Sequence, residues 1–90
     1  MSFIHSIYLQ RIATAKKNKS KRLDLSEYYY YRPYPLYEIP DAVQELSSLE
    51  ELILTNNQLE TLPTWLKTLP NLKMVDVRQN PLKEPCLMPK

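Results

Sequence analysis

The chain has 90 residues, enough for one domain at most, and its 43% hydrophobic and 24% charged residues are typical of a globular protein. One cysteine excludes an internal disulfide, the absence of glycine excludes a glycine-rich phosphate loop, and no apolar run reaches the ~20 residues that span a bilayer. The net charge of +2 is uneven, because residues 1–23 carry six basic side chains and no acidic one.

The N-terminal segment, residues 1–22, has the pattern of an amphipathic helix followed by a basic turn. Apolar side chains at spacings of four and three form one stripe, with Ser2 as an N-cap and Lys16 and Lys17 at the C-terminal end. We predict a helix that covers the first repeat of the domain. The alternative is a mitochondrial targeting or membrane-surface helix, which the short apolar face disfavours. The stripe consists of Ile4, Tyr8, Ile12 and Ala15.

Two long segments repeat after 23 residues. The apolar positions and the asparagine of 49–59 recur in 72–82. The apolar positions and the proline of 36–49 recur in 59–72. Leu52 and Leu54 alternate at period two, which predicts a short strand with both side chains on one face. Asn57 and Asn80 are placed to satisfy main-chain groups in the turn that follows. Stacked coils of this kind share one core that a single coil cannot form.

A weaker first repeat precedes these two. Leu23 and Leu25 predict its strand, and Leu36 and Ile39 its return, but the spacing between them exceeds that of the other repeats by six residues. The insertion is rich in tyrosine. Because tyrosine and arginine are favoured at binding hot spots, the insertion is a secondary binding candidate, although filling of the core is an equally good interpretation. The residues concerned are Tyr29, Tyr30, Tyr31 and Arg32.

The pattern L-x-x-L-x-L-x-x-N-x-L-x-x-L-P-x-x-L-x-x-L over 49–69 resembles the leucine-rich repeat family, and its 23-residue period with Leu-Pro is similar to the Ras-suppressor-type and bacterial subclasses. The resemblance implies an α/β solenoid: a short right-handed superhelix with an N-terminal capping helix and three parallel strands on its concave side. It covers about 23–82, in about three repeats, and leaves 83–90 as a tail. It also implies recognition of a protein or peptide on the concave side.

Within each predicted strand, the residues that alternate with the buried leucines point to the concave face. They form a three-by-three patch with Ile53 at its centre and a charged rim, an arrangement that suits a protein or peptide ligand. A merely solvated sheet surface is the alternative. The nine residues are Arg22, Asp24, Ser26, Glu51, Ile53, Thr55, Met74, Asp76 and Arg78.

The sequence offers little for catalysis. The single histidine, His5, and the single cysteine, Cys86, fall at opposite ends of the predicted stack and cannot form a nucleophile–base pair within one chain. We therefore expect no enzymatic activity, no metal and no cofactor. Nucleic-acid binding by the basic segment is the alternative function, but the acidic remainder of the chain disfavours it, and we expect no membrane binding. A cytoplasmic location follows by default.

The C-terminal end of the predicted stack is exposed. After Leu82 the chain has only eight residues, so Val75, Val77 and Leu82 form an apolar edge with little to cover it. Leu87 and Met88 could fold back over this edge. A second alternative is that the unpaired strand edge is a site of association, and we predict concentration-dependent homo-oligomerisation there. A third is that the chain is a fragment of a longer protein.

Overall fold

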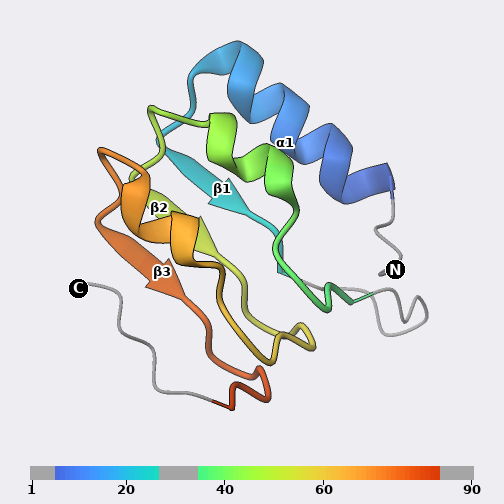
Figure 1. Ribbon diagram of the computed structural model, residues 1–90. Helices are drawn as coiled ribbons and strands as arrows, with labels where there is room; N and C mark the ends of the chain where they lie inside the picture. The colour runs from blue at the N-terminus through green and yellow to red at the C-terminus, as the bar shows by residue number, and fades with distance from the viewer. Residues whose placement is uncertain (1–5, 27–34, 84–90) are drawn as a thin grey trace.

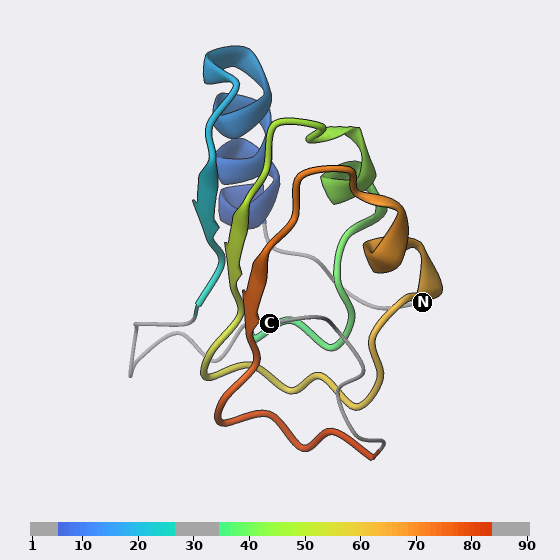
Figure 2. The same cartoon turned by 90° about the vertical axis from the view of Figure 1, so that its left-hand side faces the viewer.

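The computed structural model describes residues 6–26 and 35–83. Helix α1 (Ser6–Asn18) is followed by three short strands, β1 (Arg22–Asp24), β2 (Glu51–Ile53) and β3 (Met74–Asp76). Two 3₁₀ helices, η1 (Asp41–Glu45) and η2 (Thr64–Thr68), lie between the strands. Figures 1 and 2 show the strands side by side along one side of the molecule and the helical turns along the other. The predicted Ser2 cap, Ile4 and the Tyr29–Arg32 insertion lie outside the described residues.

The sheet is parallel, with strand order β1-β2-β3. Paired residues of β2 and β3 are 23 positions apart in the sequence, as in Glu51 and Met74. Paired residues of β1 and β2 are 29 positions apart, as in Arg22 and Glu51. The extra six residues equal the insertion expected from the sequence, so the first coil carries the insertion without losing the register of its strand.

The core lies between the strands and the helical turns. Leu52 and Leu54 are fully buried, and Leu49 and Leu59 before and after them are fully buried too. Each 3₁₀ helix begins after a proline, Pro40 or Pro63, which is its N-cap and whose carbonyl accepts from the N–H of Val43 or Leu66. Each adds one fully buried side chain to the core, Val43 from η1 and Leu66 from η2.

Helix α1 packs against the first coil. Tyr8, Ile12 and Ala15 are buried and belong to the same core cluster as the leucines, which confirms that part of the predicted stripe. The helix ends in a Schellman motif, in which the Ser20 N–H donates to Ala15 O at 2.9 Å and the Lys19 N–H donates to Lys16 O at 3.3 Å. No helix in the described part of the chain is long and apolar enough to cross a membrane.

The Schellman motif requires a left-handed residue, a position that glycine usually takes. In this glycine-free chain Lys19 takes it, with φ of 51°. Asn56 and Gln79 also have positive φ. These two residues occupy equivalent positions to each other, in the turns that follow β2 and β3. A side chain with a Cβ destabilises this conformation by roughly 1 kcal/mol, less so for asparagine, so the fold carries a small backbone strain at Lys19 and Gln79.

The two repeat asparagines join neighbouring coils. The Asn57 carboxamide accepts from the Leu36 N–H at 2.8 Å and donates to Leu25 O at 3.0 Å and to Leu54 O at 3.1 Å. Asn80 makes the same set one coil later: it accepts from the Leu59 N–H and donates to the carbonyls of Leu54 and Val77. Asn57 is 2% exposed, whereas Asn80 is half-buried.

We expect Asn57→Ala to lower the free energy of unfolding by about 3 kcal/mol, because it removes three buried hydrogen bonds and leaves their partners unsatisfied. Asn80→Ala should cost about 1 kcal/mol, because water can reach the groups that it exposes. Urea denaturation of both variants beside the parent measures the difference. Equal losses would contradict the claim that burial sets the value of these bonds.

We expect Lys19→Gly to raise the free energy of unfolding by about 1 kcal/mol, because glycine adopts positive φ without a steric penalty. Lys17→Gly is the matched control, since it removes the same charge inside the helix and should cost about 1 kcal/mol. Thermal unfolding of the two variants should therefore shift in opposite directions. A loss of stability in both would show that the Lys19 side chain, and not its backbone, matters.

Candidate binding face

The sheet register brings the predicted binding residues into rows across the three strands. Arg22 lies beside Glu51, and Glu51 beside Met74; one row further on, Ile53 lies between Asp24 and Asp76. The third predicted row, which consists of Ser26, Thr55 and Arg78, lies just after the ends of the strands. We call the side of the sheet that carries these nine residues the open sheet face.

Two of the nine side chains, which the sequence predicted to be exposed, are buried. Ile53 is 7% exposed, because it sits in the central strand with a neighbour in register on each side. It is nevertheless outside the core cluster, as expected for the face opposite the leucines. Ser26 is 2% exposed, because its hydroxyl turns back to donate to Asp24 Oδ1. The expected exposed apolar centre is therefore absent from the described part of this face.

The exposed surface of the open sheet face is mainly charged. Arg22, Glu51 and Arg78 are exposed, and Asp24, Thr55, Met74 and Asp76 are half-buried. Arg22 Nε lies 4.0 Å from Glu51 Oε1, and both side chains are about half exposed or more. An exposed pair of this kind contributes roughly 0–1 kcal/mol to stability, so the fold does not depend on it. Met74 supplies the accessible apolar surface.

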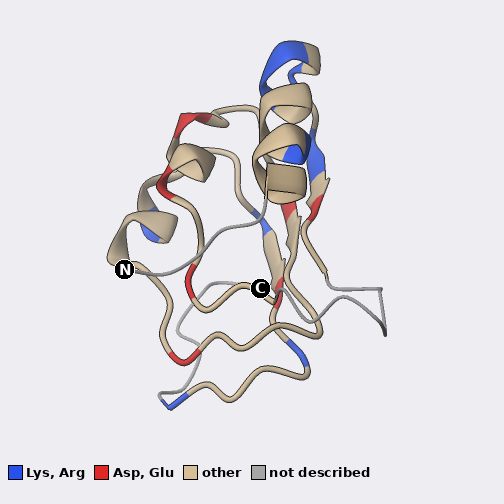
Figure 3. Cartoon of the chain, turned by 90° about the vertical axis from the view of Figure 1, so that its right-hand side faces the viewer, with Lys and Arg blue, Asp and Glu red and all other residues tan. Residues whose placement is uncertain are grey.

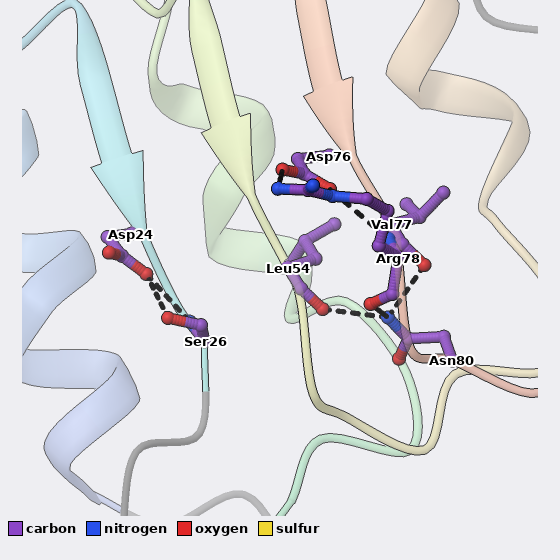
Figure 4. Close-up of polar contacts among 7 residues, drawn as sticks. All are labelled: Asp24, Ser26, Leu54, Asp76, Val77, Arg78 and Asn80. Atoms are coloured by element: carbon purple, nitrogen blue, oxygen red, sulfur yellow. Dashed lines mark hydrogen bonds and ion pairs between the residues drawn. The ribbon is translucent and has the colours of Figure 1, made fainter.

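Two aspartates form matching turns in the first and third coils (Figure 4). Asp24 accepts from the N–H of Ser26 at 2.9 Å, and Asp76 accepts from the N–H of Arg78 at 3.2 Å. The guanidinium of Arg78 also binds both carboxylate oxygens of Asp76, at 2.9 and 2.8 Å. The hydrogen bonds from Arg78 outweigh partial burial and lower the pKa of Asp76 below its ordinary value of 3.8.

A groove of about 400 Å³ extends the open sheet face beyond β1. The sequence analysis did not predict this groove. The signal that could have indicated it is helical spacing: Arg11 and Ala15 are four residues apart, as are Gln10 and Thr14, so these side chains share the face of α1 that lines the groove. Arg11 donates from Nη1 to the carbonyls of Asp24 and Ser26 at 3.4 Å each, and its guanidinium carbon lies 6.0 Å from the Tyr8 ring centroid. The groove is lined by Gln10, Arg11, Thr14, Ser20, Arg22 and Asp24, among others.

The basic segment lies at the end of α1 and in the turn into β1 (Figure 3). Lys16 forms an ion pair with Glu45 of η1, and Arg22 lies beside Glu51. Two of its cations thus have acidic partners within the chain, while Lys17, Lys19 and Lys21 are exposed.

The other candidate residues are placed as follows. The secondary candidates Tyr29, Tyr30, Tyr31 and Arg32, together with His5 and Cys86, lie outside the described residues. Over residues 6–26 and 35–83, no group of three or more histidine, cysteine, aspartate or glutamate side chains could hold a metal ion.

A parallel sheet built from stacked coils, with aligned side chains on the face opposite the core, defines a repeat-type binding scaffold. The family model described as leucine rich repeat matches residues 38–82, which is half of the chain. The chain therefore belongs to the leucine-rich repeat family, whose domains generally mediate protein–protein interaction and are typically non-catalytic.

The chain is also similar to a plant protein. The chain is 44% identical to the Disease resistance-like protein DSC1 of Arabidopsis thaliana over 43 residues, which is 48% of this chain. The chain spans 4% of the length of that protein. The likeness therefore concerns a small part of that protein.

The Asp76–Arg78 pair gives a prediction for pH dependence. The pKa of Asp76 is lowered in the folded state, so its ionisation stabilises the fold above the ordinary pKa of 3.8, and this contribution is lost as the pH falls through the folded value. In Arg78→Gln we expect the pKa of Asp76 to rise, as measured by carboxyl ¹³C NMR titration. The stability difference between parent and variant should shrink in acid. An unchanged Asp76 titration would contradict the pairing.

Proposed function

We propose that this chain is a non-catalytic module that binds a protein or peptide across the open sheet face. The observation that carries the proposal is the register, which aligns side chains of all three strands on the face that the core does not use. The leucines on the opposite face hold the coils together, so residues such as Glu51 and Met74 can vary or bind without loss of the core. We further propose that α1 acts as the cap of a right-handed superhelix.

The charges of this face suggest the chemistry of its ligand. Arg22 and Glu51 contribute one row with opposite charges, and Asp76 and Arg78 contribute a second pair near the other end. A peptide with both acidic and basic side chains and an apolar residue against Met74 would complement such a surface. The groove beside β1 would lengthen the binding surface past Arg22.

Binding of a nucleic acid or of a membrane surface stays a prediction. Nucleic-acid or membrane-surface binding would use Lys17, Lys19 and Lys21, and such binding should weaken steeply as the salt concentration rises. Binding around Met74 should depend on salt much less. A cytoplasmic location is likewise a proposal.

Peptide selection tests the open sheet face. Peptides selected from a displayed random library on the immobilised chain should bind Glu51→Arg and Met74→Glu at least about tenfold more weakly than the parent, the loss typical of a residue at an interface centre. Glu38→Arg is the matched control, because Glu38 is an exposed glutamate outside the strands, and should leave binding unchanged. Equal binding by all variants would place the ligand elsewhere, and failure to select any peptide would contradict the proposal.

A further inference from the structure

The two edges of the sheet differ in how their main-chain groups are occupied. In β1, the Leu25 N–H donates to Ile53 O of β2, so the main-chain groups of the alternating residues Asp24 and Ser26 point away from β2. Arg11 of α1 donates to both of these outward carbonyls. The helix therefore occupies the edge of β1 and blocks the approach of another strand.

The outer edge of β3 has a different character. The Met74 N–H donates to Glu50 O, and Asp76 O accepts from the Leu54 N–H. Alternation then directs the N–H and C=O of Val75 and Val77 away from β2. Val77 O accepts one bond from Asn80, whereas the equivalent carbonyl in the inner coil, Leu54 O, accepts two asparagine bonds. A carbonyl oxygen has two lone pairs, so among the contacts of the described residues Val77 O retains capacity for a second donor.

The side chains at this edge are also less buried than their counterparts one coil earlier. Leu49, Leu52, Leu54 and Leu59 are fully buried. The four residues that follow them by 23 positions are only partly buried and pack against the core. Covering them would remove apolar surface from water, which is the main driving force of association. These residues are Leu72, Val75, Val77 and Leu82.

We propose that a second copy of this chain pairs with β3 edge to edge, antiparallel, across a twofold axis. Head-to-tail stacking is blocked, because Arg11 occupies the β1 edge of the incoming copy. The matching surface on a second copy is its own β3, and two identical edges make a closed, isologous contact. The assembly therefore stops at a dimer.

The pattern of outward groups selects the register. With Val75 opposite the partner's Val77, and Val77 opposite the partner's Val75, each pair exchanges two main-chain hydrogen bonds. β-Branched residues also suit such cross-strand pairs. In this register no outward N–H or C=O of these two valines is left without a strand partner.

Charge on the open sheet face makes this register depend on Arg78. Asp76 would face its own symmetry mate, an unfavourable contact of like charges. Arg78 binds Asp76 within each chain, and it lies diagonally opposite the partner's Asp76, a separation that a long side chain can reach. Arg78 therefore compensates both carboxylates, and the dimer depends on it.

The test is sedimentation equilibrium of the full chain over a wide concentration range, with a reductant present so that Cys86 cannot link two copies. The apparent mass should rise from the 10.7 kDa of the monomer toward twice that value and no further. Hydrogen exchange of the Val75 and Val77 amides should slow in step with association. A monomer at the highest concentration would overturn the proposal, as would a dimer in which these two amides exchange unchanged.

Variants separate this edge from other surfaces. Val77→Pro removes an outward N–H without removing a bond to β2 and should weaken association at least about tenfold, with circular dichroism to check the fold. Arg78→Glu should weaken it similarly, whereas Lys17→Glu, the same charge change on α1, should not. Exchanging the two charges, Asp76→Arg with Arg78→Asp, should restore it. Conversion of a monomer into a dimer by removing 84–90 would show that the tail occupies the edge, and would overturn the proposal for the full chain.

Discussion

The carboxamide of Asn57 is the contact on which the stack of coils depends. A short strand followed by a turn leaves main-chain N–H and C=O groups inside the protein, and these groups must find partners there. Asn57 serves two coils at once, because it bonds to Leu25 and Leu36 of the first coil and to Leu54 of its own. No other residue type combines an acceptor and two donors in so short a side chain.

This arrangement separates the structural from the functional side chains. Leucines on one face of the strands and the asparagines at the turns hold the coils in register, as the pairing of Leu23, Leu52 and Val75 shows. The alternating residues on the opposite face are then not needed for the core. Arg22, Glu51 and Met74 lie in one row for this reason, and a binding surface can be formed from them at little cost to stability.

The proposed dimer follows from the same repetition. Each coil has main-chain N–H and C=O groups at its far edge that a following coil would bond. The outermost strand of a stack therefore keeps unpaired main-chain groups unless another segment or molecule covers them. At the first coil Arg11 and the apolar face of α1 cover the edge. At the third coil Val75 and Val77 are only partly buried, and the proposed dimer would cover them.

Residue spacing was enough to predict the coils: the 23-residue period, the six-residue insertion, the strands around Leu23, Leu52 and Val75, and the role of the asparagines. Each follows from local spacing, because periodicity decides which side chains share a face. Three features became apparent only in the folded chain: the burial of Ile53 between Asp24 and Asp76, the hydrogen bond from the Ser26 hydroxyl to Asp24, and the contact of Arg11 with the edge of β1. These features depend on the distances between segments that are remote in the sequence. Residue spacing does not specify such distances.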